Sequence, residues 1–340
     1  MKAVVCEYPG QLRIVERPAP HRADDDVLVR IGRVGLCGTD FHIFTGQHPF
    51  LAYPRVMGHE LSGEVVAAPA GSPFRHGQTV SINPYLACGT CVACRKRKPN
   101  ACVNISVLGV HADGGMCELL SVPQSAVIDA TGLTLDQAAM LEFLAIGAHA
   151  VGRSTIRPGD AVLVAGAGPI GIAVALFARL DGANVTLVDK RETRLAYARD
   201  RLGFDNVVPA GPDLSAVLSD RTQGDLFDIV FDATGSVEAM AQSLDHLAHG
   251  GELVLVGVAP GDLVFPDPEF HKRESRVLAS RNALKADFER VIAAIKAGKL
   301  PLDALHTHSF PIEEMSDRLP QLMAGADHVL KAIGSFRGRS

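Results

Sequence analysis

The chain has 340 residues, about two domains' worth if one domain takes roughly 150 residues. Hydrophobic residues make up 47% of it and charged residues 21%, a composition that excludes a disordered chain and predicts a sizeable core. Lys and Arg total 33 against 38 Asp and Glu, a formal net charge of −5. No broad basic surface is expected, so nucleic acid is excluded as the main partner.

The first 130 or so residues predict a β-rich domain. Residues 27–31 and 61–68 are dense in β-branched and aliphatic side chains, and Gly and Pro separate such runs. Glu7 and Pro9 interrupt the N-terminal segment before a secretory apolar core would form, so we expect no signal peptide. Further along, residues 137–151 carry apolar side chains at helical spacing.

After a turn at residues 157–160, apolar runs alternate with segments of helical spacing. Buried parallel strands are predicted at residues 161–165, 185–188, 229–231, 253–256 and 277–280. Helices are predicted at residues 170–181, 192–202, 237–248 and 287–297. This alternation predicts an α/β fold with a doubly wound parallel sheet and right-handed crossovers. The residues beyond it are too few for a separate domain, so we expect them to rejoin the N-terminal domain.

The uncharged stretch 161–178 lies at the short edge of a membrane-spanning length. Glycines interrupt its middle, so we expect a strand, a turn and a helix there, and no membrane partner. Its turn reads Gly-Ala-Gly-Pro-Ile-Gly and matches G-x-G-x-x-G at the opening of a helix. The candidate cofactor residues are Gly166, Gly168, Pro169, Ile170 and Gly171.

The glycines and the proline of this turn each have a physical role. Gly166 permits the tight turn, Gly168 lets the backbone approach a pyrophosphate, and Gly171 lets helix and strand pack closely. The helix N-terminus offers free N–H groups to phosphates, and Pro169 suits the first turn because its missing N–H costs little there. The turn therefore predicts a dinucleotide site.

Asp189 ends the next predicted strand, about 20 residues beyond the turn. Its carboxylate would accept hydrogen bonds from an adenine ribose 2′-hydroxyl and repel a 2′-phosphate, which favours NAD over NADP. Lys190, Arg191 and Arg194 keep NADP as an alternative, since cations bind that phosphate. Lys190 and Arg191 are interpreted as a solvated helix face, and Arg194 as a contact of the adenosine.

Four of the seven cysteines fall within one short window: Cys88, Cys91, Cys94 and Cys102. An odd total with this clustering argues against a secreted disulfide framework, so we expect a cytoplasmic protein with a metal site. Four thiolates with no open position suit a closed, structural zinc. An iron–sulfur cluster is the chemical alternative, because cysteines at C-x-x-C spacing also begin ferredoxin ligand sets.

A second group of candidate ligands is dispersed along the chain. Cys37, His59 and Glu142 offer a thiolate, an imidazole and a carboxylate. An open catalytic zinc needs three protein ligands and one exchangeable oxygen. Each residue alone has a plain structural interpretation, but the three together are compatible with such a site.

In combination, these motifs resemble the zinc-dependent medium-chain alcohol and polyol dehydrogenase family over nearly the whole chain. The matching pieces, in order, are CGTDFH at 37–42, GHE at 58–60, the four-cysteine segment, DGG at 113–115, and GAGPIG with Asp189. The resemblance implies a β-rich GroES-like catalytic domain, residues 1–146 completed by 285–340. It also implies a Rossmann NAD-binding domain at residues 147–284.

The resemblance further implies a catalytic zinc on Cys37, His59 and Glu142. Some branches have a second Cys as third ligand, but this chain has no cysteine after Cys117, and Glu142 stands there as in the sorbitol and threonine dehydrogenase branches. Phe143 replaces the Pro that usually follows this Glu. In the family, Glu60 ligates the metal, acts through water or displaces the water; the alternative is a carboxylate that orients its neighbours.

By the same resemblance, Thr39 takes a proton from the substrate hydroxyl and passes it through the nicotinamide ribose to His42. Histidine titrates near neutrality and would hand the proton to solvent. Thr234, Val256, Gly257 and Val258, at the ends of two predicted strands, are expected to border the nicotinamide, with plain turns as the alternative.

Residues 267–274 and 280–283 look most like the branch that acts on hexonates such as L-galactonate or L-gulonate. Arg281, at the end of the last predicted strand, would hold a carboxylate or a row of hydroxyls, with a structural ion pair as the alternative. Further candidates for the substrate pocket are Gln47, His48, Phe50 and His111.

We therefore expect a zinc- and NAD-dependent dehydrogenase that oxidises a secondary hydroxyl of a sugar acid or polyol to the ketone. A threonine-type amino-alcohol dehydrogenase is the alternative within the enzyme class, and a non-catalytic NAD-binding protein on the same fold is the alternative outside it. The resemblance also implies a dimer or tetramer of identical chains.

Overall fold

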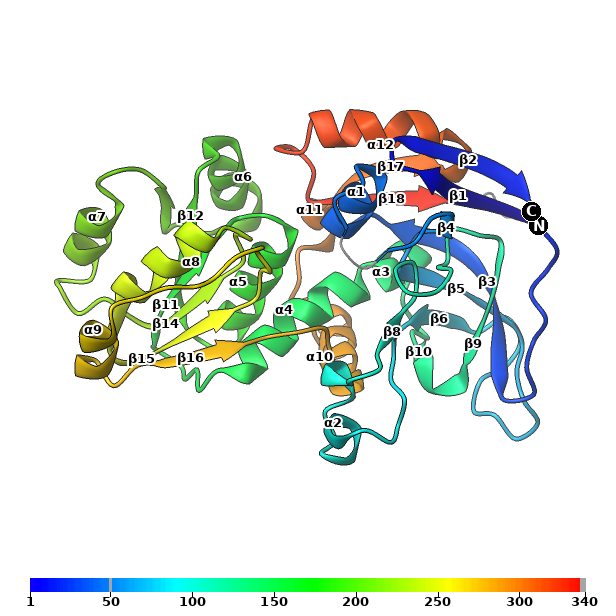
Figure 1. Ribbon diagram of the computed structural model, residues 1–340, viewed down its shortest axis with the longest axis horizontal. Helices are drawn as coiled ribbons and strands as arrows, with labels where there is room; N and C mark the ends of the chain where they lie inside the picture. Colours follow the sequence, from blue (N-terminus) through cyan, green and yellow to red (C-terminus); the bar gives the residue numbers. More distant parts are fainter. Residues whose placement is uncertain (49–50, 337–340) are drawn as a thin grey trace. The chain divides into compact units, whose positions relative to one another are not determined.

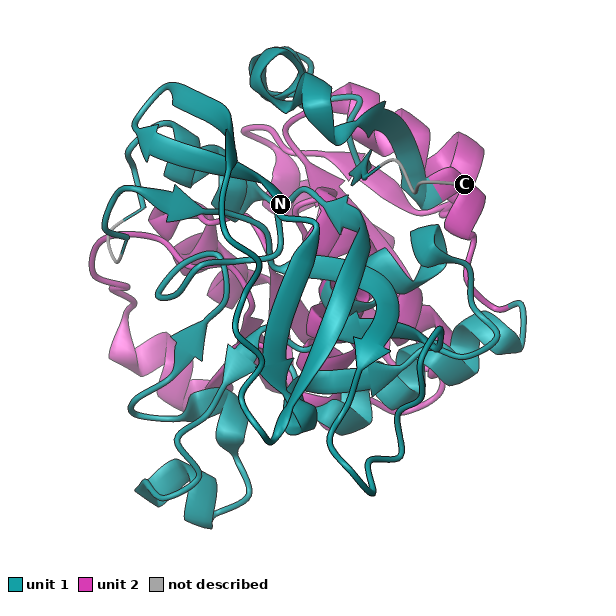
Figure 2. Ribbon diagram, turned by 90° about the vertical axis from the view of Figure 1, so that its right-hand side faces the viewer, with its two compact units in different colours: residues 1–142, 283–298, 305–340 teal, residues 143–282, 299–304 magenta. Residues whose placement is uncertain are grey.

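The structure is a computed structural model that describes residues 1–48 and 51–336. The chain divides into two units, coloured separately in Figure 2. The first comprises Met1–Glu142, Ala283–Gly298 and Leu305–Ser340, and the second comprises Phe143–Asn282 and Lys299–Ala304. Segments from both halves of the chain thus build the first unit.

The first unit is rich in strands. They are β1 (Lys2–Tyr8), β2 (Gln11–Glu16), β3 (Asp26–Gly35), β4 (Arg55–Val56), β5 (Glu60–Ala67), β6 (Thr79–Ile82), β7 (Tyr85–Leu86), β8 (Ser106–Val107), β9 (Leu119–Pro123), β10 (Val127–Asp129), β17 (His306–Pro311) and β18 (Lys331–Ser335). The largest sheet has the order β10-β6-β5-β3-β18-β17, and β9 also pairs with β3. The late strands β17 and β18 therefore extend a sheet begun by the N-terminal segment.

Two smaller sheets, β2-β1-β4 and β7-β8, complete the strands of this unit. Its helices are α1 (Gly38–Phe44), α2 (Val92–Arg95), α3 (Leu135–Ala139), α10 (Lys285–Lys296) and α12 (Met315–Ala324), with 3-10 turns η1 (Pro99–Ala101), η2 (Gln124–Ala126) and η4 (Ile312–Glu314). The core gathers aliphatic side chains of the sheet, among them Val29, Ile31, Leu61 and Ile82, all fully buried. Buried positions alternate with more exposed ones along β3 from Asp26 to Ile31, as in a sheet with one covered face, whereas the first four residues of β5 are all buried.

The second unit is one parallel sheet with helices. Its strands are β11 (Ala161–Ala165), β12 (Asn184–Asp189), β13 (Val207–Pro209), β14 (Phe227–Asp232), β15 (Leu247–Leu255) and β16 (Arg276–Ala279). Its helices are α5 (Pro169–Leu180), α6 (Glu192–Leu202), α7 (Leu214–Arg221), α8 (Val237–Ser243), η3 (Leu244–His246) and α9 (Asp267–Lys272); α4 (Leu141–Arg153) and α11 (Leu302–Leu305) each span the division between the units.

The sheet of the second unit has the order β13-β12-β11-β14-β15-β16, and all its neighbouring strands are parallel. Counted along the chain this is 3-2-1-4-5-6, the Rossmann order, so the predicted doubly wound sheet is confirmed. Figure 1 labels β11, β12, β14, β15 and β16 of this sheet, in the green to orange part of the chain. The order reverses beside β11, where the glycine-rich turn begins.

Two predicted helices differ from the structure. The helix expected at 137–151 is interrupted at Met140, between α3 and α4, and α3 begins already at Leu135, behind a capping box of Thr134 and Gln137. The helix expected at 237–248 ends at Ser243, and β15 already begins at Leu247, which pairs with Phe227 of β14. In both segments the apolar residues keep their helical spacing beyond the end of the helix, because these side chains are buried whether the backbone is helical or not.

The uncharged stretch 161–178 forms β11, the glycine-rich turn and most of α5, as predicted. Across residues 1–48 and 51–336, no helix combines the length and the apolar character needed to cross a membrane.

Candidate metal centre and cofactor turn

The structure brings three predicted ligands together in the first unit. The Cys37 sulfur, a ring nitrogen of His59 and a carboxylate oxygen of Glu60 all lie within 4.8 Å of one another. Cys37 precedes α1, and His59 directly precedes β5, which Glu60 begins. Because Glu60 pairs with Gly35 at the end of β3, the two segments meet although they lie apart in the sequence, and His59 and Glu60 are buried.

Glu142, in the first turn of α4, lies beside this group but is not one of the donor atoms within 4.8 Å. Its Oε1 accepts a hydrogen bond from the Tyr85 hydroxyl, and among the described residues its buried Oε2 has no hydrogen-bond partner. Its charge is close enough to contribute to raising the pKa of both His59 and Glu60. Phe143, which follows it, is fully buried.

His59 shows which charge the site favours. Burial alone lowers its pKa, but Asp40, the Cys37 sulfur and Glu142 outweigh burial and hold the pKa well above the usual value. Its Nδ1 lies 3.9 Å from Asp40 Oδ1, and neither atom has a hydrogen-bond partner among the described residues. The cluster thus stabilises positive charge, and its sulfur, imidazole and carboxylate donors are those that zinc takes. These residues fit a zinc ion.

A buried lysine completes the surroundings of Glu60. Lys331 Nζ lies 2.6 Å from each Glu60 oxygen and donates a hydrogen bond to the Leu36 carbonyl at 3.1 Å. Burial raises the pKa of Glu60, and the ammonium of Lys331 opposes that rise. Lys331 and Tyr85 belong to none of the sequence motifs, and Asp40 is marked only as part of the CGTDFH motif.

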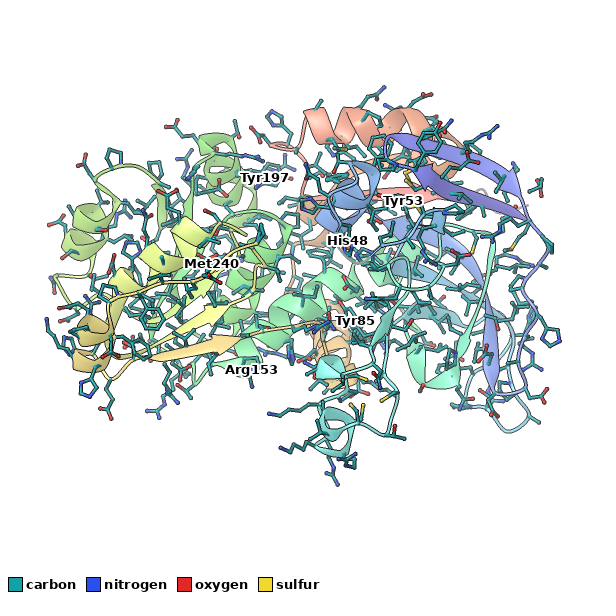
Figure 3. All side chains as sticks on the ribbon, in the orientation of Figure 1. His48, Tyr53, Tyr85, Arg153, Tyr197 and Met240 are labelled. Carbon is teal, nitrogen blue, oxygen red and sulfur yellow. The ribbon has the colours of Figure 1, made fainter. Side chains whose placement is uncertain are left out.

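The residues predicted for the proton relay lie on α1. Thr39 Oγ1 is 3.8 Å from the Cys37 sulfur, and His42 Nδ1 is 3.4 Å from Gln47 Oε1. His48, labelled in Figure 3, has a pKa lowered by burial and by the neighbouring His111, His42 and His59. His111 Nδ1 accepts a hydrogen bond from the backbone N–H of Val107. Phe50 lies outside the described residues.

The four predicted cysteines of the second cluster surround α2. Their sulfurs lie within 4.8 Å of one another, with Cys88 and Cys102 3.5 Å apart and Cys91 and Cys94 also 3.5 Å apart. Backbone N–H groups of Thr90 and Cys91 lower the pKa of Cys88 to about 5. A closed set of four sulfurs near one point is the donor arrangement of a structural zinc.

The glycine-rich turn has the geometry that its sequence predicts. Gly166 has φ +96°, and a Cβ at Gly171 would overlap the Gly166 carbonyl. Asp189 Oδ2 accepts a hydrogen bond from the N–H of Ala167 at 2.7 Å, and Arg194 Nη1 lies 3.9 Å from the same oxygen. The guanidinium of Arg194 also lies beside Gly168, since a Cβ there would be 3.3 Å from Nη1.

The other candidate cofactor residues lie at strand ends of the same sheet. Thr234 donates from its N–H and its hydroxyl to Asp232 Oδ1, just after β14. Gly257 follows β15, and a Cβ there would lie 2.8 Å from the backbone nitrogen of Gly235. Of its neighbours, Val258 is strongly exposed and Val256 is partly buried. Arg281, the substrate candidate of this unit, is exposed just beyond β16.

Known proteins share this arrangement of domains. An alcohol dehydrogenase GroES-like domain matches residues 23–132, and a zinc-binding dehydrogenase domain matches residues 169–297. The chain is 40% identical to the L-galactonate-5-dehydrogenase of Escherichia coli K12 over 337 residues, which is 99% of each chain. Among solved structures, an alcohol dehydrogenase (rspB) of Escherichia coli CFT073 complexed with NADH has a TM-score of 0.92 at 30% identity, covering 99% of each chain.

A protein of Sinorhizobium meliloti 1021 bound to NADP has a TM-score of 0.90 at 28% identity, covering 98% of each chain. The two matched domains, the near full-length identity and the Rossmann order of the second unit agree with one another. This chain therefore belongs to the zinc-dependent alcohol dehydrogenase family, oxidoreductases that act on CH–OH groups.

Proposed function

We propose that this chain oxidises a secondary hydroxyl of a sugar acid or polyol to the ketone, with NAD as the hydride acceptor and a zinc ion held by Cys37, His59 and Glu142. The observation that carries the proposal is the buried meeting of the Cys37 sulfur and the His59 ring with acidic oxygens, where positive charge is stabilised. The substrate class is supported by the 40% identity to an L-galactonate-5-dehydrogenase.

Zinc supplies a Lewis acid that stabilises negative charge on an alcohol oxygen. In this chain, a Cys37 thiolate and a Glu142 carboxylate would together balance the charge of a divalent ion. Glu142 has one oxygen occupied by Tyr85 and the other without a partner among the described residues, so one donor atom is free. Asp40 faces Nδ1 of His59, the place of a carboxylate that orients a ligating imidazole.

The proton would leave through α1. The Thr39 hydroxyl lies beside the Cys37 sulfur and would take the proton of the substrate hydroxyl. His42 lies three residues further, on the same side of the helix, and would release the proton to solvent. The protein's remaining task is to hold the nicotinamide against the substrate carbon.

NAD is the proposed cofactor because Asp189 presents a carboxylate at the end of β12. Its backbone contacts to Ala167 and Arg191 hold it in place at the mouth of the turn. Arg194 lies close enough to pair with a 2′-phosphate, so NADP is the cofactor to be compared. The four-cysteine cluster would hold a second, structural zinc. The proposal includes a homo-oligomer of two or four chains.

The substrate would be held by Arg281, with Gln47 and His111 as further contacts. A guanidinium pairs bidentately with a carboxylate, which suits a hexonate. Polyols lack the carboxylate, so a strong dependence on Arg281 would separate the two substrate types.

The experiment is a substrate panel with the purified zinc-loaded chain. L-galactonate, L-gulonate, sorbitol and L-threonine are each offered with NAD and with NADP, and the absorbance of the reduced cofactor is followed. We expect turnover with a hexonate or polyol, and a lower KM for NAD than for NADP. Turnover with threonine alone would contradict the sugar assignment. NAD binding without turnover of any alcohol would favour a non-catalytic protein.

A further inference from the structure

Glu60 and Lys331 form an ion pair closed to solvent. The exposed fraction is 0% for Glu60 and 1% for Lys331, and the ammonium lies 2.6 Å from both carboxylate oxygens. The third hydrogen bond of the ammonium goes to the Leu36 carbonyl. Every oxygen of Glu60 therefore faces the same cation, at the short distance of a charge-assisted hydrogen bond.

The sheet makes room for this pair at Gly35. Glu60 begins β5 and pairs with Gly35 of β3, while β18, which Lys331 begins, pairs with the other edge of β3 through Ile333. A Cβ at Gly35 would collide with Glu60 Oε2 and lie 2.9 Å from the Glu60 Cβ. The missing side chain at Gly35 leaves the space through which Glu60 crosses β3 to reach Lys331.

Two carboxylates, Glu60 and Glu142, lie near the proposed metal position, and they differ in their hydrogen-bond partners. Glu60 has a donor oxygen within 4.8 Å of the Cys37 and His59 donors, so its position alone would allow it to ligate. Both of its oxygens, however, are held by Lys331. Glu142 keeps one buried oxygen without a partner among the described residues. A fourth protein ligand would close the position that a catalytic zinc keeps open.

We propose that Lys331 is a positioning residue that holds Glu60 beside the metal and prevents it from ligating, so that one coordination position stays open for the substrate oxygen. The inference rests on the proposed function, because it requires the metal on Cys37, His59 and Glu142. Glu60 then adds negative charge near the metal without occupying a ligand position, and Lys331 balances that charge.

The test uses the full-length chain loaded with Co²⁺, whose visible absorption reports the ligands of the ion. In Lys331→Met the Glu60 carboxylate loses its cation and is expected to join the ligands. The cobalt bands should then change in position and intensity, and kcat should fall about 10-fold or more. The four-cysteine cluster contributes the same absorption in each variant and serves as an internal reference.

The double variant Lys331→Met/Glu60→Gln removes both charges. Its amide is a poor metal ligand, so the wild-type cobalt spectrum should return, and an effect of lost packing alone would not be reversed in this way. Lys331→Arg retains the cation and should keep the spectrum. Lys2→Met is the matched control, because Lys2 forms an exposed ion pair with Glu313 in the same unit, 3.6 Å apart. It should change neither spectrum nor kcat.

Lys331→Met leaves a buried carboxylate unpaired and is expected to be destabilised. If Lys331→Met does not fold, the double variant Lys331→Met/Glu60→Gln provides the test. A wild-type cobalt spectrum in the double variant supports the proposal. A changed cobalt spectrum shows that the Glu60–Lys331 pair belongs to the ligand set and overturns the proposal. An unchanged spectrum in a folded Lys331→Met also overturns it. Uptake of only one metal ion per wild-type chain would instead overturn the proposed metal centre, and this inference with it.

Discussion

The carboxylate of Asp189, at the end of β12, accepts a 2.7 Å hydrogen bond from the backbone N–H of Ala167 in the turn that follows β11. Its other oxygen accepts a 2.8 Å hydrogen bond from the N–H of Arg191. One side chain therefore joins the ends of two neighbouring strands at the place where the strand order reverses. The carboxylate that shapes the cofactor turn is thus also the one proposed to bind a ribose hydroxyl.

Replacing this carboxylate by its amide tests the cofactor assignment. Asp189→Asn should raise KM for NAD by about 10-fold, since a hydrogen bond to a charged group contributes about 1.5–3 kcal/mol. KM for NADP should fall, because the negative charge that repels a 2′-phosphate is gone. Asp200→Asn is the control: Asp200 pairs with Arg199 on the exposed side of α6. Initial rates with both cofactors give the two KM values, and unchanged KM values in Asp189→Asn would refute the assignment.

Close packing at the glycine-rich turn gives a prediction about stability. In Gly171→Ala the new Cβ would overlap the Gly166 carbonyl and lie 2.8 Å from its carbon, so the free energy of unfolding should fall by roughly 2–3 kcal/mol. Gly152→Ala, in α4 with no atom within 4 Å of the new Cβ, should raise it by up to about 1 kcal/mol. Denaturant titration of both variants measures the difference, and equal effects would mean that the turn tolerates a side chain.

The four-cysteine cluster gives a prediction about the number of zinc ions bound by each chain. Metal analysis of the wild-type chain should find two zinc ions, and Cys91→Ser should lose one of them because a hydroxyl replaces a thiolate ligand. The thermal midpoint should fall with the lost ion, since structural zinc contributes folding energy. Cys117→Ala changes a buried thiol outside both ligand groups and should keep two zinc ions. Iron in the wild-type protein would support the iron–sulfur alternative instead.

A buried histidine in the second unit predicts a pH dependence of stability. Burial, aided by the guanidinium of Arg273, lowers the pKa of His246 against the opposing charge of Asp245. The unfolded chain therefore takes up this proton first as pH falls, and the free energy of unfolding decreases between about pH 7 and pH 5.

His246→Gln should flatten this decrease, because the amide does not titrate and can still bond the hydroxyl of Ser215, 3.2 Å from the native ring nitrogen. His249→Gln, at an exposed position of the strand β15 that follows, should keep the wild-type slope. Thermal midpoints measured across this pH range test the prediction. Parallel curves of midpoint against pH for wild type and His246→Gln would exclude His246 as the cause of the decrease in stability.

The sequence predicted the second unit well where strands are long and apolar. β11, β12 and β14 are continuous buried runs bounded by turn residues, and the glycine pattern fixes which strand comes first. It did not predict β13, which has three residues, or α7, in which Leu218 is the buried residue. Elements this short, or with so little apolar surface, leave no periodicity to detect.

The residues of the candidate site also fall into two groups: those that a sequence motif marks, and those that only the fold brings together. Cys37, His59 and Glu60 belong to short sequence motifs, as do the four cysteines of the second cluster, and the donor atoms within each group lie within 4.8 Å of one another. Lys331 has no motif, and its partner Glu60 lies 271 residues away in the chain. Tyr85 bonds Glu142 across 57 residues. Only the folded sheet brings such residues together, so no pattern in the sequence marks them.

The central claim is tested most directly by anomalous X-ray diffraction at the zinc absorption edge from crystals of the purified chain. The account predicts two zinc ions in each chain, one among the four sulfurs around α2 and one bonded to Cys37, His59 and Glu142. A single ion confined to the four-cysteine cluster, with the three other side chains carrying no metal, would contradict it.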